Sequence, residues 1–130
     1  MPVVSFSDKD LLRGRVITPG WYIVRIDQIG EKLSKNQEST NFLVEATILG
    51  NADDGSTEFA NFPLEWNFNS KAMGFAVGYL KALGFEVEAG KRYDLSATAG
   101  KSLKVFIEND IYEGRTVNRV NHKYMALDAA

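Results

Sequence analysis

The chain contains no cysteine, which excludes disulfide bonds and thiolate metal sites. His122 is the only histidine, so no pair of histidines can bind a metal from one helix, and no run of aspartates resembles a calcium loop. We therefore expect no metal ion and no other cofactor. Catalytic fingerprints are missing too, since there is no Gly-x-Ser-x-Gly, phosphate-binding loop or dinucleotide motif. These absences together predict a protein that is not an enzyme.

Long hydrophobic runs and targeting signals are also missing. Gly74, Gly78, Lys81 and Gly84 interrupt the most apolar stretch, which is therefore too short for a membrane span. Residues 1–8 contain no basic region followed by an apolar region, so they do not form a signal peptide. We expect a cytoplasmic protein without membrane contacts.

The sequence lacks a strong excess of either charge, and its formal net charge is −2. Residues 101–124 differ from the rest of the chain, because they carry five Lys or Arg against three Asp or Glu. Ordinary solvated strand faces explain such a balance equally well. A nucleic-acid binder with so little positive charge would need aromatic rings that stack on bases.

The sequence contains patterns of five strands and one helix in a chain of single-domain length. Alternating apolar and polar residues predict strands over residues 21–29, 42–49, 58–68, 101–109 and 115–124. Between the first two strands lies a polar segment, residues 30–41, which we interpret as a long loop. We divide the chain into an N-terminal arm (1–17), a domain (18–124) and a flexible tail (125–130).

The helix is expected over residues 71–83, with Ser70 as its N-cap and Gly84 at its C′ position. A short additional strand is expected around residues 92–95. One helix between the third and fourth strands is the order of an OB-type barrel. The fold class is thus mainly β: a five-stranded OB-type Greek-key barrel with one α-helix between strands 3 and 4.

Several short motifs carry a resemblance to a known family. They are Pro19-Gly20-Trp21-Tyr22, Lys32-Leu33-Ser34-Lys35-Asn36, Ala82-Leu83-Gly84, Gly100-Lys101-Ser102-Leu103-Lys104-Val105 and Tyr112-Glu113-Gly114-Arg115-Thr116-Val117-Asn118-Arg119-Val120. Through them the chain resembles phage-encoded single-stranded DNA-binding proteins with an OB fold, which are associated with DNA replication and recombination. The resemblance implies a location in the bacterial host cytoplasm. Residues 126–130 lack the acidic tail through which many such proteins recruit replication partners.

An OB topology would bring the first loop, the second and third strands and the last hairpin to one side of the domain. Cations and aromatic residues in these regions are our candidates for binding nucleic acid. They are Lys32, Lys35, Trp66, Lys104, Phe106, Tyr112, Arg115 and Arg119. Phe106 is the most informative of them, because it breaks the inward register of its apolar neighbours and shares a face with Lys104.

Two of these candidates, Trp66 and Phe106, also have a structural interpretation. Trp66 shares its face with apolar residues and fits a core position better than a binding position. Phe106 is equally consistent with a ring that the N-terminal arm or a subunit partner covers. Glu45 and Glu65, on the outer register of their strands, disfavour phosphate binding.

The sequence-based hypothesis is that the protein binds single-stranded DNA with little sequence preference and supports phage DNA replication or recombination. A dimer is expected, because one barrel holds only a few nucleotides, and Phe75 and Tyr79 could supply its contacts. The alternative is an OB-fold protein-interaction or assembly module that does not bind nucleic acid. The negative net charge favours this alternative.

Overall fold

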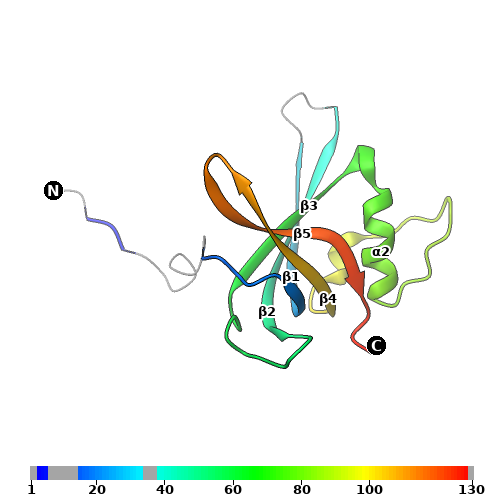
Figure 1. The fold of residues 1–130 in the computed structure, drawn as a ribbon. Coiled ribbons are helices and arrows are strands. Elements are labelled where there is room, and N and C mark those ends of the chain that lie inside the picture. The colour runs from blue at the N-terminus through cyan, green and yellow to red at the C-terminus, as the bar shows by residue number, and fades with distance from the viewer. Residues whose placement is uncertain (1–2, 6–14, 34–37, 129–130) are drawn as a thin grey trace.

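Five antiparallel strands form one sheet in the computed structural model, which describes residues 3–5, 15–33 and 38–128 (Figure 1). The strands are β1 (Gly20–Leu33), β2 (Thr40–Asn51), β3 (Pro63–Asn69), β4 (Ser102–Tyr112) and β5 (Arg115–Met125). Helix α2 (Gly74–Ala82) lies between β3 and β4 in the chain, and 3₁₀ turns at Ser70–Ala72 and Leu95–Thr98 flank it. A mainly β fold with a helix at this place in the order is therefore confirmed.

The strand order is β3-β2-β1-β4-β5, so the long strand β1 pairs with both β2 and β4. β3 and β5 are the two edges of this sheet. Within the described residues the sheet is not closed by pairing of these edges, and a closed barrel is therefore not confirmed. Pro63 is the first residue of the edge strand β3, a position where its missing N–H costs no ladder hydrogen bond.

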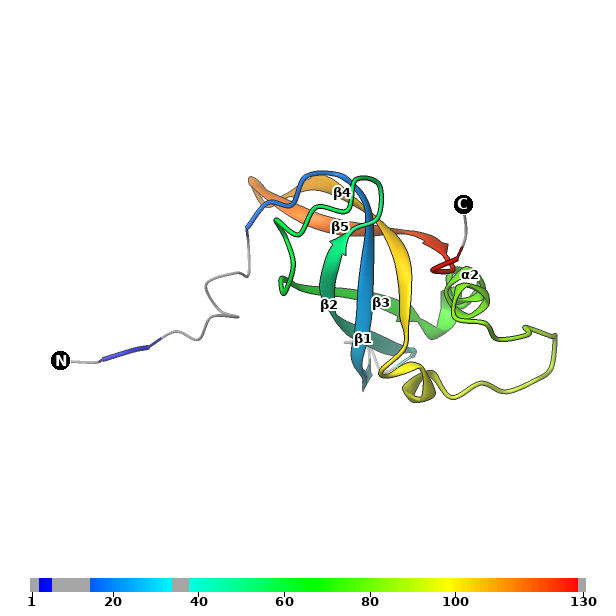
Figure 2. The ribbon, with the colours of Figure 1, turned by 90° about the horizontal axis from the view of Figure 1, so that it is seen from below.

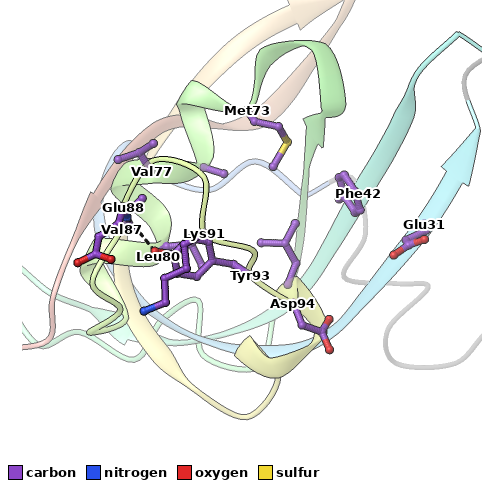
Figure 3. Close-up of a pocket in the computed structure, with 12 residues that line it drawn as sticks. Glu31, Phe42, Met73, Val77, Leu80, Val87, Glu88, Lys91, Tyr93 and Asp94 are labelled. Atoms are coloured by element: carbon purple, nitrogen blue, oxygen red, sulfur yellow. Dashed lines mark hydrogen bonds between the residues drawn. The ribbon is translucent and has the colours of Figure 1, made fainter.

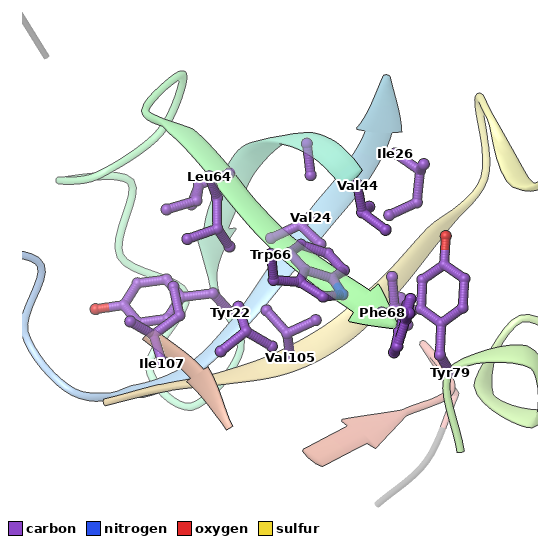
Figure 4. Close-up of a cluster of buried hydrophobic side chains, with 14 of the residues drawn as sticks. Tyr22, Val24, Ile26, Val44, Leu64, Trp66, Phe68, Tyr79, Val105 and Ile107 are labelled. Carbon is purple, nitrogen blue, oxygen red and sulfur yellow. The ribbon is translucent and has the colours of Figure 1, made fainter. Parts of the chain in front are cut away.

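The apolar residues of the strands alternate onto one face of the sheet, where they form the core (Figure 4). β1 supplies Tyr22, Val24 and Ile26 to this face, and β3 supplies Trp66 and Phe68. Side chains of β2, β4 and β5 complete it, and α2 closes one end. The period-2 alternation in the sequence therefore identifies the inner face of β1 to β4, whereas β5 fully buries only Val120.

Helix α2 begins later than its sequence pattern predicts, and it buries Tyr79 together with Ala76 and Leu80. Asn69, rather than Ser70, caps the preceding 3₁₀ turn by accepting the Lys71 N–H, and α2 itself starts at Gly74. Tyr79 is fully buried and its hydroxyl shares a hydrogen bond of 2.7 Å with Thr98 Oγ1. Burial raises the pKa of Tyr79 to about 12. The hypothesis that Tyr79 contacts a subunit partner is therefore wrong.

Both ends of the polar segment 30–41 are strand rather than loop, and residues 34–37 lie outside the described part of the chain. β1 continues to Leu33 and β2 starts at Thr40, with Lys32 opposite Asn41. The backbones of β1 and β2 still pair there, but the side chains are not buried in the core. The alternation of apolar and polar residues that predicts a strand is therefore absent from this part of the sequence. The third strand is shorter than predicted, since residues 58–61 form turns, and the region predicted as a strand at 92–95 leads into the 3₁₀ turn at Leu95–Thr98.

A two-residue turn connects β4 and β5. Glu113 and Gly114 both have positive φ values, 50° and 76°, which is the backbone of a type I′ hairpin turn. β4 therefore extends three residues beyond its predicted end at Asn109, and β5 starts at Arg115 as predicted. Nearer the core, a bulge places residues 121–123 of β5 opposite Phe106, and His122 at its centre has φ 49°.

Residues just outside both boundaries of the predicted domain (18–124) contact that domain. Ile17 is buried, and its N–H donates to Asn118 Oδ1 at 2.9 Å. The Asn118 side-chain amide in turn donates to the Arg15 carbonyl at 2.7 Å. At the other end Met125, the last residue of β5, lies opposite Lys104.

None of the helices in the described part of the chain has the length and apolar character needed to cross a membrane.

Candidate nucleic-acid interface

An aromatic pair lies on the outer face of the sheet, where β1 and β4 run side by side. Trp21 and Phe106 are cross-strand partners, and both are half-buried. Their ring centroids lie 5.4 Å apart at an interplanar angle of 75°. This edge-to-face contact holds both rings in place, because aromatic pairs prefer that geometry.

The bulge in β5 brings a cation onto this pair. Lys123 Nζ lies 5.2 Å from the centroid of the Phe106 ring. His122, with its positive φ, points the other way and packs between Phe68 and Phe75. Because of the bulge, the side chains of His122 and Lys123 lie on opposite sides of β5. We call Trp21, Ile23, Lys104, Phe106 and Lys123 the outer patch.

Lys104 joins the outer patch through its strand register. It lies opposite Ile23 on β1 and Met125 on β5, two residues from Phe106 on the same face. Arg25 follows on that face of β1, and its guanidinium pairs with Asp27 at 3.1 Å. Rings and cations thus adjoin each other on the outer surface of the β1-β4-β5 part of the sheet.

The tip of the β4-β5 hairpin carries three more of the predicted residues. Tyr112 is 61% exposed and lies opposite Arg115, which is also exposed. Arg119 forms an ion pair with Asp110 at 3.1 Å, and both side chains are about half exposed. A pair this exposed contributes little to stability, so Arg119 can exchange Asp110 for a phosphate at small cost.

Of the other three predicted residues, Lys32 and Trp66 do not join this surface, and Lys35 cannot be placed. Lys32 is exposed near the far end of β1 from Trp21, and Lys35 lies outside the described residues. Trp66 is 6% exposed on the inner face, where it contacts Tyr79 and Tyr124. We therefore leave Trp66 out of the candidate interface.

The inner aromatic cluster around Trp66 is a packing feature. Burial raises the pKa of the Tyr124 hydroxyl well above its usual range, and the adjacent Tyr79 adds to this rise. Among the described residues, the Trp66 indole N–H has no hydrogen-bond partner of ordinary geometry. The indole nevertheless lies close to the Tyr124 hydroxyl and lowers the pKa of Tyr124 slightly, against the larger effect of burial. His122 Nδ1 lies 3.0 Å from the Tyr124 hydroxyl, and burial lowers the pKa of His122.

Carboxylates occupy the outer face of β2 and β3. Glu45 and Glu65 are direct cross-strand partners, and Asp27 lies beside them in the wall of a shallow pocket. The Glu45 carboxylate accepts a hydrogen bond from the Gln28 amide. Asp27 accepts one from Thr47 and pairs with Arg25. We call Asp27, Glu45 and Glu65 the acidic strip, and a phosphate chain would avoid it.

The sequence analysis selected Phe106 and Lys104, which adjoin each other in the structure, but did not select Lys123 or Trp21. A strict alternation through β5 gives Lys123 no specific partner. The available signal was Asn121-His122, two residue types that tolerate positive φ and therefore a bulge.

Comparison with known proteins adds no assignment to this geometry: no protein-family model matches the sequence, and a search of curated proteins gives no match. Within residues 3–5, 15–33 and 38–128, no group of three or more His, Cys, Asp or Glu side chains is arranged to hold a metal ion.

Proposed function

We propose that this protein binds single-stranded DNA with little sequence preference and that its fold is of the OB type. The strand pairing supports the fold, since β1 pairs with both β2 and β4 and the helix lies between β3 and β4. The edges β3 and β5 also line a common groove of about 390 Å³. Completing the pairing across this groove would give the closed barrel.

The observation that carries the function is the Trp21–Phe106 pair with Lys123 over the Phe106 ring. Half-buried rings on an outward strand face offer surfaces on which bases stack, at about 1–3 kcal/mol per base. Lys123 and Lys104 adjoin these rings and would neutralise the phosphates of the stacked nucleotides. Strand backbone holds every one of these residues, so the surface is organised before the ligand arrives.

The acidic strip restricts the path of the strand. DNA would cross the outer patch and continue along the β4-β5 hairpin past Arg119, Arg115 and Tyr112. It would not follow the outer face of β2 and β3, where Glu45 and Glu65 lie opposite each other. The resemblance to phage single-stranded DNA-binding proteins suggests replication or recombination in a bacterial host cytoplasm as the setting.

Tryptophan fluorescence tests this proposal, because the chain has only two tryptophans and the structure gives them different environments. Titration with oligo-dT should quench the emission of the wild-type protein. The quench should persist in Trp66→Phe and disappear in Trp21→Phe. A quench that survives Trp21→Phe would place the DNA elsewhere, and no binding at micromolar protein in low salt would remove the DNA proposal.

The acidic strip favours a second candidate, a protein-interaction module that never contacts nucleic acid. Three carboxylates on one sheet face suit a basic protein partner better than a phosphate chain. The same titration separates the two candidates, since this module would leave both tryptophans unquenched by oligo-dT.

A further inference from the structure

A pocket of about 470 Å³ lies between α2, the segment 87–95 and the paired strands β1 and β2 (Figure 3). Its volume is in the range of sites that enclose a small ligand. One wall is a stripe of α2 side chains at helical spacing, and we call it the α2 stripe. It consists of Met73, Ala76, Val77 and Leu80, and Phe42 and Tyr93 line the pocket as well. Neither the outer patch nor the acidic strip contributes to this pocket.

The segment 87–95 belongs to the long connection that leaves α2 in a wide loop and returns to β4 (Figure 2). Hydrogen bonds within this loop fix its shape. The Tyr93 hydroxyl donates to the Glu86 carbonyl at 2.5 Å and accepts from the Glu88 N–H at 2.8 Å. Asp94 caps the 3₁₀ turn Leu95–Thr98 by accepting a backbone N–H at 3.0 Å. The pocket wall that this loop forms therefore has a defined shape before a ligand arrives.

The charged residues at the rim of the pocket are mostly acidic. Glu31, Glu88 and Asp94 are exposed there, against one cation, Lys91. None of these carboxylates belongs to an ion pair among the described residues. Hydrogen bonds from Ser96 lower the pKa of Asp94, so this carboxylate is ionised at neutral pH.

The single cation lies at one end of the rim. The Lys91 N–H donates to the Glu88 carbonyl at 3.3 Å, and Lys91 Nζ lies 5.9 Å from the centroid of the Tyr93 ring. Glu31 and Asp94 lie at the other end, as the close-up shows (Figure 3). The electrostatic potential at that end is therefore negative, and it adjoins the apolar walls.

Charge and shape together select the kind of ligand. The rim would repel carboxylates and phosphates, which excludes acids and nucleotides. A cation beside Glu31 and Asp94 would form charge-assisted hydrogen bonds, which are roughly twice as strong as neutral ones. An apolar body gains free energy in proportion to the apolar surface that it removes from water. A ligand that satisfies both parts of the pocket carries a positive charge at one end and an apolar body at the other.

We infer that this pocket binds a small organic amine, with its apolar body against the α2 stripe and its ammonium group beside Glu31 and Asp94. The ligand class is a primary amine with an aromatic or branched aliphatic body. This site is independent of the proposed DNA binding, because the pocket and the outer patch have no residue in common.

An NMR titration of the isotope-labelled full chain with phenethylammonium, without DNA, tests this site. The probe combines a benzene ring with an ammonium group. At low salt it should shift the amide signals of Val77, Leu80 and Tyr93 saturably, with a Kd of about 1 mM or below. Phenylpropanoate has the same body with the opposite charge, and ethylammonium has the charge with almost no body. Each should bind at least tenfold more weakly than phenethylammonium.

A first variant removes the charges that face the ammonium group. Glu31→Gln/Asp94→Asn keeps the size of both side chains, and asparagine retains the capping of the 3₁₀ turn. This variant should bind phenethylammonium at least tenfold more weakly. Glu86→Gln is the matched control, because Glu86 is exposed but does not line the pocket, and it should bind like the wild type.

A second variant tests the apolar wall. Val77→Lys places a cation on the α2 stripe, where it would repel the ammonium group, and it should also weaken binding at least tenfold. Gly74→Lys places the same charge at an open position of the same helix and should bind like the wild type. Wild-type signals that do not shift up to about 10 mM phenethylammonium, equally tight binding of phenylpropanoate, or unchanged binding by either folded pocket variant would each overturn the inference.

Discussion

Removing the two lysines of the outer patch should change the salt dependence of DNA binding by a calculable amount. Lys104 and Lys123 adjoin the Trp21–Phe106 pair, so each should neutralise one phosphate of a strand stacked there. Every neutralised phosphate of a single strand contributes about 0.7 to the slope of log K against log salt. The double variant Lys104→Ala/Lys123→Ala should therefore reduce the magnitude of this slope by about 1.4.

This difference is large enough to measure. Between about 50 and 200 mM salt, a slope contribution of 1.4 corresponds to about a sevenfold loss of affinity, which the wild type should show in excess of the double variant. Fluorescence anisotropy of a labelled oligo-dT over that salt range gives both slopes. Lys81→Ala, an exposed lysine on α2, is the matched control and should retain the wild-type slope.

Trp21→Ala should behave differently, because it removes a stacking ring and no charge. Its slope should equal that of the wild type, while its affinity falls at every salt concentration by roughly 5- to 150-fold for a loss of about 1–3 kcal/mol. If the lysine variant keeps the wild-type slope, the outer patch does not contact phosphate, and the reasoning from its geometry is refuted.

Three further results are expected. Gly78→Ala should stabilise the protein by about 1 kcal/mol, since the new methyl group meets only Tyr124 at an ordinary 3.7 Å, and thermal unfolding should show a Tm about 4 °C higher. Gly84→Ala should lower the Tm, because Gly84 ends α2 with φ 93° and alanine at such a φ costs about 1–2 kcal/mol. The NMR titration of His122, the only histidine, should give a pKa below its usual value of about 6.5. The unfolded chain then binds this proton more readily, so stability should fall as the pH drops below about 6.5, and His122→Gln should reduce that loss.

The fold could be anticipated from the sequence where burial is one-sided. Tyr22, Val24 and Ile26 are buried and alternate with the less buried Ile23 and Arg25, because one face of β1 packs on the core. Gly84 marks the end of α2 as predicted. The prediction failed where backbone pairing continues without burial, as in the exposed ribbon around Lys32. There the strands are defined by backbone hydrogen bonds alone, and the side-chain pattern does not indicate a strand.

The candidate interface was only partly accessible from the sequence. Phe106 stood out because it departs from the inward alternation of its strand. Its relation to Trp21 depends on which residues of β1 and β4 are paired, a property of two segments that are far apart in the chain. Its relation to Lys123 depends on the bulge at His122, which shifts the register by a local change of backbone rather than of composition.

The negative net charge does not argue against a DNA-binding surface once the charges are located. Glu45 lies opposite Gln28, seven residues along β1 from Trp21, which corresponds to roughly 23 Å of strand. The Debye length at physiological salt is only about 8 Å, so exposed charges at that separation are largely screened from each other. A strand on the outer patch would respond to Lys104 and Lys123 and very little to Glu45 and Glu65. The net charge is a sum over separate faces of the domain. A ligand on one face would respond mainly to the charges of that face, because the charges of the other faces are screened from it.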